Sequence, residues 1–154
     1  MKKNKINYVN KFYNENGWNL KNQKTLDAQL FEDLRKVATK YVSKCRLRLL
    51  RHIPKKGENI LDFASGPIQY PEYLKYSEKY KYRHCVDFSK KAINVAKKKI
   101  GKKGKYYCQN FFKIKFKKDY FDCIISLHTI YHIHKNDQKK AVKKLIKISK
   151  KNSP

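Results

Sequence analysis

Residues 59–67 read Asn-Ile-Leu-Asp-Phe-Ala-Ser-Gly-Pro, a short apolar run that ends in small residues. Such a run is typical of a buried strand followed by a turn in which the backbone can approach a ligand closely. Three further strands are predicted, over 81–87, 105–109 and 120–127. Helical patterns separate them, and strands that alternate with helices form a parallel sheet with helices on its faces, so the sequence predicts an α/β fold.

Residues 25–53 carry apolar side chains at steps of three and four, which is the pattern of one long amphipathic helix. Thr25 is a suitable N-cap, and Pro54 ends the run. Ser89 is expected to cap another helix, which Gly101 stops. The helices after the first strand are predicted over 71–77, 89–100 and 136–150.

The composition indicates one folded domain rather than a basic tail. The chain has 154 residues with 39 Lys and Arg against 12 Asp and Glu, a net charge of +27, and 40 % of its residues are apolar. That apolar content can offset the entropy lost on folding. No run reaches the roughly 20 apolar residues of a membrane span, and residues 1–6 lack the apolar region of a signal peptide. The expected location is the cytosol, with no membrane contact.

The positive charge has two interpretations that the sequence leaves open. Lysines number 34 and arginines only five. Surfaces that read bases or clamp phosphates favour Arg for its bidentate fork, whereas solvated Lys attracts any polyanion weakly. The charge is therefore either compositional drift, shared with the many Asn, Ile, Tyr and Phe residues, or a lysine-rich surface that binds RNA.

The four cysteines are spread without a C-x-x-C pair, and three of them lie in strand-like apolar runs. This pattern predicts buried free thiols rather than disulfides or a metal site. The cysteines are Cys45, Cys85, Cys108 and Cys123.

In open α/β sheets, ligands bind beyond the carboxyl ends of the strands. The first strand is followed there by Ala64, Ser65 and Gly66, and the second strand ends in an acid, Asp87, 21 residues after Gly66. An acid at this spacing accepts hydrogen bonds from the two hydroxyls of a ribose. The turn lacks the G-x-G-x-x-G pattern that binds a pyrophosphate, so the residues favour a nucleoside cofactor without phosphates.

Four motifs in this order resemble the class I S-adenosylmethionine-dependent methyltransferases, in particular their type-11 group. The motifs are Asn59-Ile-Leu-Asp-Phe-Ala-Ser-Gly66, His84-Cys-Val-Asp-Phe-Ser89, Tyr107-Cys-Gln-Asn110 with Lys113-Ile-Lys-Phe116, and Phe121-Asp-Cys-Ile-Ile-Ser126. The resemblance covers about 58–154 and implies a Rossmann-like domain there that binds S-adenosylmethionine. Residues 1–57 are expected to form an N-terminal lid or helical segment, and the whole chain a single folding unit.

The resemblance also implies a set of cofactor-binding residues. Ala64, Ser65 and Gly66 are expected to pack against the methionine portion, Asp87 to hold the ribose and Asn110 to meet the adenine amino group. Asn110 stands where the family usually has Asp, and Ala64 and Ile68 where many members have Gly, so weaker cofactor binding is expected. The full predicted set is Asp62, Ala64, Ser65, Gly66, Asp87, Phe88, Asn110, Phe111 and Leu127. Asp62 is expected to organise the turn rather than to touch the cofactor.

The acceptor side follows the fourth strand. His128, Tyr131 and His132 are the candidate catalytic residues there, because a neutral imidazole can take a proton from an attacking hydroxyl or amine. Packing or capping is the alternative role for these histidines, and more so for His134. Tyr13 and Trp18 either close over the cofactor as a lid or pack into the core.

The predicted function is transfer of a methyl group from S-adenosylmethionine to an unidentified acceptor, a small molecule in preference to a polymer. The alternatives are a nucleic-acid-binding protein, an RNA methyltransferase, or a catalytically impaired short methyltransferase.

The family fold continues after its fourth strand and helix into further strands, so a mostly parallel sheet of about four strands in the order 3-2-1-4 is expected here, without the C-terminal strands. The fourth strand would then be an open edge that pairs with another copy or with a partner chain.

Overall fold

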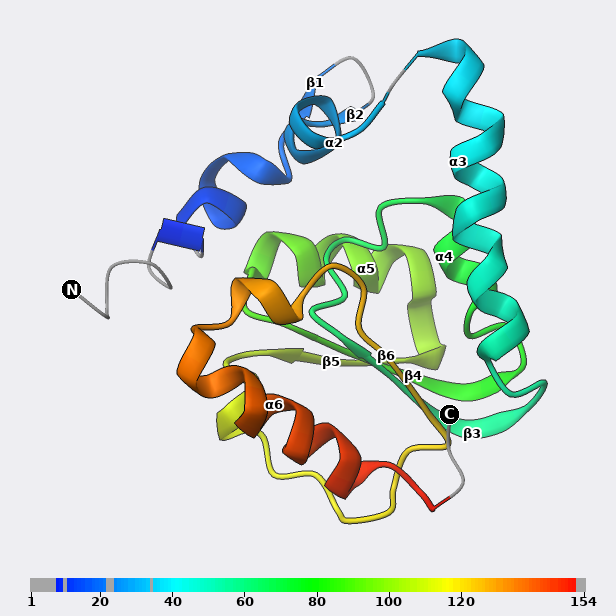
Figure 1. Ribbon diagram of the computed structural model, residues 1–154, viewed down its shortest axis with the longest axis vertical. Helices are drawn as coiled ribbons and strands as arrows, with labels where there is room; N and C mark the ends of the chain where they lie inside the picture. Colours follow the sequence, from blue (N-terminus) through cyan, green and yellow to red (C-terminus); the bar gives the residue numbers. More distant parts are fainter. Residues whose placement is uncertain (1–7, 10, 22–23, 34, 152–154) are drawn as a thin grey trace.

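The computed structural model describes residues 8–9, 11–21, 24–33 and 35–151 (Figure 1). The N-terminal part contains the π-helical turn η1 (Tyr13–Gly17), β1 (Leu20–Lys21), β2 (Lys24–Thr25), α2 (Leu26–Phe31), α3 (Lys36–Arg48) and the 3₁₀ turn η2 (Leu49–His52). The remainder contains β3 (Gly57–Phe63), α4 (Pro71–Lys75), β4 (Tyr80–Asp87), α5 (Lys90–Ile100), η3 (Gly101–Lys103), β5 (Gly104–Cys108), η4 (Phe111–Lys113), β6 (Cys123–Ile125), η5 (Ile130–His132) and α6 (Lys135–Ile148).

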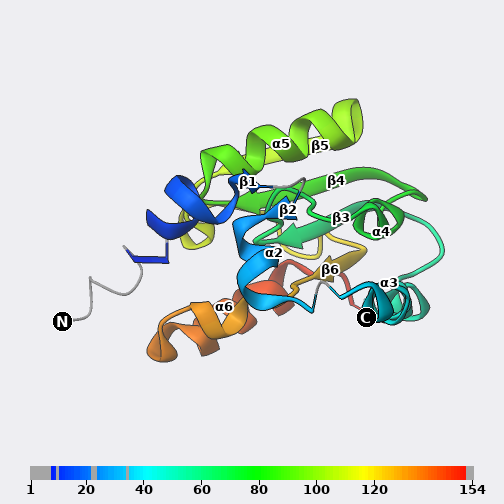
Figure 2. The same cartoon turned by 90° about the horizontal axis from the view of Figure 1, so that it is seen from above.

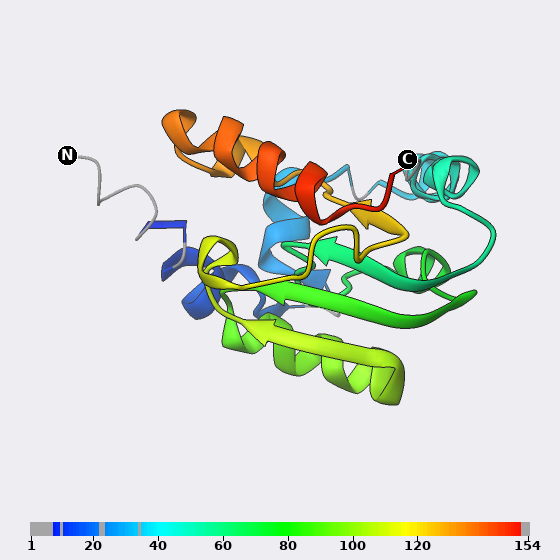
Figure 3. The same ribbon diagram turned by 90° about the horizontal axis from the view of Figure 1, so that it is seen from below.

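Four parallel strands form the main sheet in the order β5-β4-β3-β6 (Figures 2 and 3). This is the 3-2-1-4 order predicted for the four strands of an α/β domain. β3 lies in the middle, with Asp62 opposite Cys85 of β4 on one side and opposite Ile125 of β6 on the other. All four strands point the same way, so their carboxyl ends meet at one edge of the sheet (Figure 3).

Alternating side chains along the strands supply two apolar layers, because successive residues of a strand point to opposite faces. On one face Leu61, Phe63 and Val86 pack beside Ile148 of α6. On the other face Ile60 packs against residues from η2 and α4, and α5 packs against Cys85 of β4. Figure 1 shows α5 above the sheet and α6 below it.

The N-terminal helix differs from the prediction, which was a single helix over 25–53. Thr25 caps as expected, its Oγ1 accepting a hydrogen bond from the backbone N–H of Ala28 at 3.2 Å. The helix stops at Phe31, however, and Glu32 is extended. The Asp33 carboxylate accepts hydrogen bonds from the backbone and the guanidinium of Arg35, a local arrangement that competes with helix continuation. A second helix, α3, follows this interruption.

Two other helix ends agree with the sequence. Ser89 caps α5 through a 3.2 Å bond from the N–H of Ala92, and Gly101 ends it with a φ of 65°. The cap of α6 differs: His134 Nδ1 accepts from the N–H of Asn136, so this helix begins before the predicted Asn136 or Asp137.

The cysteines are free thiols, but the prediction that they are buried holds only in part. Cys85 and Cys123 are buried in the sheet, whereas Cys108 at the end of β5 is exposed and Cys45 is half-buried. Among the described helices, none is both long and apolar enough to cross a membrane.

Candidate functional site

The turn after β3 and the end of β4 meet at the carboxyl edge of the sheet. The backbone N–H of Gly66 donates a 2.9 Å hydrogen bond to Oδ2 of Asp87, and the N–H of Ser89 donates a 2.8 Å bond to Oδ1. Ala64 and Gly66 both have φ of 55°, the left-handed conformation that glycine adopts most easily. The turn predicted to receive the cofactor is therefore held in place by the acid predicted to bind the ribose.

Burial changes the chemistry of Asp87. Asp87 is only 7 % exposed. Loss of hydration raises the pKa of its carboxyl to about 6, although the hydrogen bonds from Ser89 and Gly66 act to lower it. The backbone N–H of Phe88 also bonds to this carboxylate, so three backbone donors share the four acceptor positions of its two oxygens. The remaining acceptor capacity is available to the hydroxyls of a ribose.

Asp62 lies under this turn and does not reach the predicted site. It forms a buried ion pair with Arg83, whose Nη2 lies 2.5 Å from Oδ2. Arg83 also donates to the carbonyl of Tyr73 and to Ser77 Oγ. This agrees with an organising role for Asp62. Its carboxylate is already paired with Arg83 on the neighbouring strand β4, which makes it a poor direct ligand of the cofactor.

The structure separates the other predicted cofactor residues into exposed and buried ones. Phe88 is exposed and follows Asp87 directly, so its ring is available to a ligand. Asn110 is exposed, but its Oδ1 already accepts a 2.9 Å bond from the N–H of Phe112 and caps η4. The ring of Phe111 is 5 % exposed and packs with its centroid 4.4 Å from that of Phe63. The side chain of Phe111 therefore belongs to the core.

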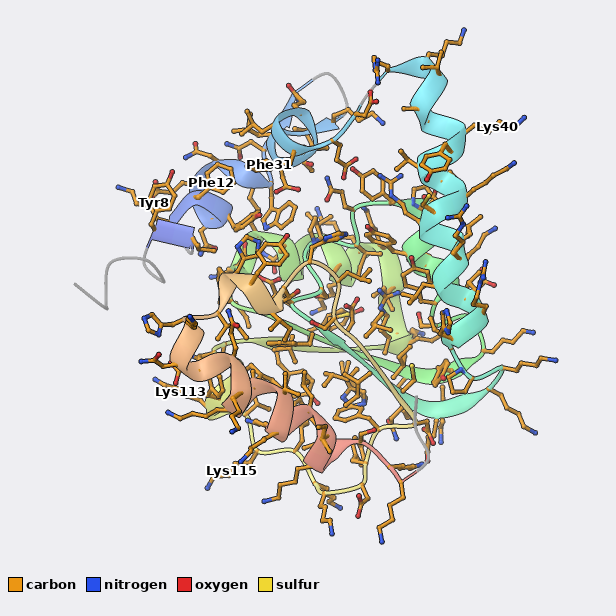
Figure 4. All side chains as sticks on the ribbon, viewed as in Figure 1. Tyr8, Phe12, Phe31, Lys40, Lys113 and Lys115 are labelled. Carbon is orange, nitrogen blue, oxygen red and sulfur yellow. The ribbon has the colours of Figure 1, made fainter. Side chains whose placement is uncertain are left out.

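The N-terminal segment covers the turn. Two atoms of the Trp18 indole would lie 3.3 Å from a Cβ placed on Gly66, and the ring of Tyr13 stacks on Trp18 with centroids 4.8 Å apart. Tyr13 donates a 3.0 Å hydrogen bond to Asp27 of α2. The indole Nε1 is shielded from solvent and has no hydrogen-bond partner among the residues that the structure describes. Figure 4 shows the neighbouring Phe12 on the same segment, above the sheet edge.

The predicted catalytic residues lie after β6. His128 is exposed with a φ of 52°, and Leu127 beside it packs on the core under α3. Tyr131 and His132 lie in η5 with ring centroids 4.3 Å apart, and His132 contacts the ring of Tyr13 at 6.2 Å. The structure thus brings Tyr131 and His132 to the covering segment, while His128 lines a separate cavity under α3.

Sequence reasoning missed the arginines of the N-terminal half. The guanidinium of Arg46 lies 3.3 Å over the ring of Tyr70 and pairs with Glu32 at 2.9 Å. Arg83 was not expected in the core at all. The available signal was their rarity: in a chain that uses Lys for nearly every positive charge, Arg46 and Arg83 stand where a guanidinium contacts several partners at once.

A parallel α/β sheet with a turn of small residues beside a strand-end acid is the arrangement expected of a domain that binds a nucleoside cofactor. Residues 61–153, more than half of the chain, match the family described as Methyltransferase domain, of the type-11 group. The chain belongs to this family of class I S-adenosylmethionine-dependent methyltransferases. The cofactor of the family is S-adenosylmethionine, as the resemblance implied. None of the curated proteins matches the chain in sequence.

Solved structures show the same fold at low identity. An S-adenosylmethionine-dependent methyltransferase from Leishmania major superposes with a TM-score of 0.72 at 13 % identity, over 99 % of this chain and 59 % of that one. Magnesium protoporphyrin IX methyltransferase from Synechocystis, solved with the cofactor bound, has a TM-score of 0.64 at 14 % identity, over 95 % and 72 %. A Methanococcus maripaludis protein described as an S-adenosylmethionine-dependent methyltransferase superposes with a TM-score of 0.58 at 17 % identity, over 75 % of this chain and 53 % of that one. The chain spans about half the length of that protein and of a Bacillus subtilis relative in fold, of which it covers 47 %.

Proposed function

We propose that this chain binds S-adenosylmethionine at the turn of residues 64–66 and transfers its methyl group to an oxygen, nitrogen or carbon of a small-molecule acceptor. When bound, the cofactor would supply an activated methyl group. An electron pair of the acceptor atom would form the new bond to the methyl carbon, the electrons of the broken carbon–sulfur bond would stay on sulfur, and the acceptor would lose a proton. Such a transfer depends mainly on in-line positioning, so the protein's task is to hold the two reactants and exclude water.

The observation that carries this proposal is the hydrogen bond between Gly66 and Asp87. It holds a turn of small residues and a carboxylate side by side at the carboxyl ends of two adjacent parallel strands. Ala64 and Gly66 lack bulky side chains, so the methionine portion would reach the backbone of the turn once the Trp18 indole moves or rests on it, and the remaining acceptor capacity of Asp87 would take the ribose hydroxyls. The covering segment with Tyr13 and Trp18 would shut the methyl group away from water.

Three residues after β6 serve the acceptor side in this proposal. The exposed imidazole of His128 or of His132 can accept the proton that the acceptor loses. Tyr131 is 61 % exposed and lies beside His132, where its hydroxyl can orient an acceptor. A dedicated base is optional, because a neutral amine attacks the methyl before it loses its proton.

Calorimetric titration with S-adenosylmethionine and with its demethylated product, S-adenosylhomocysteine, tests the proposal before any acceptor is identified. We expect one saturable site for each. Asp87→Ala should weaken the affinity at least about tenfold, since two charge-assisted hydrogen bonds are lost and about 1.4 kcal/mol is one decade. Asp119→Ala, an exposed acid away from the turn, is the matched control and should bind as the parent does. Absence of saturable binding to the folded parent chain contradicts the proposal.

A further inference from the structure

A cavity of about 620 Å³ lies between α3, α4 and the loop that follows β6. Leu49, Leu127, Tyr73 and Tyr76 give it an apolar and aromatic floor. His128 lines it from the loop after β6. This combination of an apolar floor and polar groups at the rim is typical of a small-molecule site.

The loop that lines the cavity is held against the end of β3, the strand that precedes the predicted cofactor turn. Thr129, the residue after His128, is buried and donates from Oγ1 to the carbonyl of Leu127 at 2.8 Å, with a longer contact of 3.4 Å to the carbonyl of Phe63. Phe63 is the last residue of β3 and directly precedes Ala64. The loop that lines the cavity is thus fastened to the strand end from which the cofactor turn starts.

The positive charges that line this cavity are unusual for the chain. Three of its five arginines, Arg46, Arg48 and Arg51, line it, and none of its 34 lysines does. A guanidinium presents its donors in a planar fork that matches a carboxylate or a phosphate, whereas an ammonium is a solvated point charge. Random placement of positive charge in so lysine-rich a chain would fill the rim with lysines.

Two of the three guanidinium groups remain unneutralised. Arg46 is committed to Glu32 and to the ring of Tyr70. The other acid of the lining, Asp33, is paired with Arg35 at 2.6 Å. Across the described ranges of the chain, no acidic side chain forms an ion pair with Arg48 or Arg51, and both are exposed at the rim.

We propose that this cavity holds the methyl acceptor, and that the acceptor carries an oxyanion, a carboxylate or a phosphate, which Arg48 and Arg51 bind while its apolar part rests on Leu49 and Leu127. The inference rests on the proposed methyltransferase function, and it adds the substrate class. An oxyanion held at the rim would place the rest of the molecule in the cavity, beside His128.

The test uses phenyl phosphate and benzoate as probes, titrated calorimetrically into the full chain at about 0.15 M salt, where charge interactions beyond about 8 Å are screened. We expect saturable binding of at least one probe at a single site, and the tighter probe identifies the oxyanion. The double variant Arg48→Gln/Arg51→Gln should bind at least about tenfold more weakly. The variant Arg48→Lys/Arg51→Lys keeps the charge but loses the planar guanidinium, so its affinity for the probe should lie between those of the parent and of the double Gln variant.

The matched control is Lys139→Gln/Lys143→Gln, which removes two exposed charges from α6, on the opposite face of the sheet from the cavity. Its affinity should stay within about twofold of the parent. Circular dichroism establishes that each variant folds. Equal weakening in the arginine and lysine variants would assign binding to diffuse charge and overturn the inference, as would the absence of saturable binding of both probes.

S-adenosylhomocysteine is titrated in parallel, so that the two proposals can fail separately. If the parent binds it but no probe depends on Arg48 and Arg51, the acceptor inference is wrong and the cofactor site stands. If the probes behave as expected but S-adenosylhomocysteine does not bind, the oxyanion site stands and its role as a methyl-acceptor pocket is wrong.

Discussion

The indole of Trp18 lies against the backbone of Gly66, close enough that a Cβ on the glycine would come within 3.3 Å of its Cη2 and Cζ2 atoms. A residue of the N-terminal segment thus occupies the space directly over the turn that the family uses for its cofactor. Binding of a nucleoside there requires the indole either to move or to rest on the ligand.

Trp18 should therefore report cofactor binding. It is the chain's only tryptophan, so its fluorescence comes from this position alone. We expect the emission to change in intensity and wavelength as S-adenosylhomocysteine saturates the site, because the surroundings of the shielded Nε1 change. Trp18→Phe should lose the signal while calorimetry still detects binding. Calorimetric saturation with an unchanged Trp18 spectrum would place the ligand elsewhere.

Gly66 should tolerate no side chain. Gly66→Ala places a Cβ at a φ of 55° and against the indole, so we expect cofactor affinity to fall at least about tenfold. The backbone strain costs about 1–2 kcal/mol, or a few degrees of melting temperature for a domain of this size. Gly101→Ala is the control, since it also has a positive φ but nothing within 4 Å of its Cβ. That variant should lose stability and keep its affinity; an unchanged affinity in Gly66→Ala would remove the turn from the site.

Asp87 should make cofactor affinity depend on pH. Its pKa of about 6 means that the carboxyl is protonated below that pH and can no longer accept both ribose hydroxyls. Affinity for S-adenosylhomocysteine should decrease as the pH falls from 7 to 5, and binding near pH 6 should release protons, measured from binding heats in buffers of different ionisation enthalpy. Asp87→Asn should bind weakly and without this pH dependence. A parent affinity that is constant over this range would contradict the assignment.

His84 should make the fold sensitive to acid. It is 3 % exposed, contacts Asn59 Oδ1 and the Tyr107 hydroxyl at 3.0 Å each, and has a pKa lowered to about 4 by burial and by Lys105. The pKa of His84 in the folded protein lies below the ordinary 6.5, so the folded state favours the neutral ring. The contribution of His84 to the free energy of unfolding is complete above pH 6.5 and decreases by about 3 kcal/mol as the pH falls towards 4.

The same pH range has an opposite contribution from Asp87. Its folded pKa lies above the ordinary 3.8, so the protonated form is favoured in the fold and its stabilisation is lost as the pH rises through 6. The measurement for His84 is therefore a difference: urea unfolding of the parent and of His84→Gln from pH 7 to 4. The gap in unfolding free energy between them should shrink by about 3 kcal/mol. A constant gap would show that His84 does not titrate differently in the fold.

The open side of β6 should mediate association. β6 pairs with β3 on one side, and on the other the described residues add a single bridge, between Phe121 and Ser149. Unpaired strand edges invite pairing with another chain. We propose that the 154-residue chain self-associates through this edge, which light scattering after size-exclusion chromatography would detect. Ile146→Lys, on the exposed face of α6, is the control and should leave the association unchanged. A monomer at tens of micromolar would contradict the proposal.

Sequence patterns predicted the sheet because β3, β4 and β6 are short, mostly buried apolar runs, whereas the edge strand β5 is only partly covered. The order of β5, β4, β3 and β6 followed from the family resemblance and the alternation of strands with helices. The single helix expected over 25–53 is interrupted near Asp33, where the side chain of Asp33 accepts hydrogen bonds from Arg35. The apolar periodicity of the sequence continues across this interruption and therefore did not reveal it. Periodicity reports which face is buried, and it does not report where the backbone leaves the helix.

The site was predictable where it depends on spacing and unpredictable where it depends on packing. Gly66 and Asp87 were found from their distance along the chain, and they meet in space. The packing of the Phe111 ring against Phe63 was not predicted, because nothing in a sequence shows which rings meet in the core. The cavity with Arg48 and Arg51 was missed because its lining comes from three separate segments, within 32–52, 73–76 and 127–128, which only the folded chain brings together.

Two lysines tie the loops beside the predicted cofactor site to helices on opposite faces of the sheet. Lys99 of α5 donates to the carbonyl of Ile68 at 2.6 Å, two residues after Gly66. Lys144 of α6 donates to the carbonyls of Phe111 and Ile114, at 2.6 Å each, in the segment after Asn110. A third lysine, Lys91 of α5, donates to Oδ1 of Asn19, beside Trp18, so the segment that covers the site is tied to the same helix layer and any widening of the entrance must break at least one of these lysine contacts.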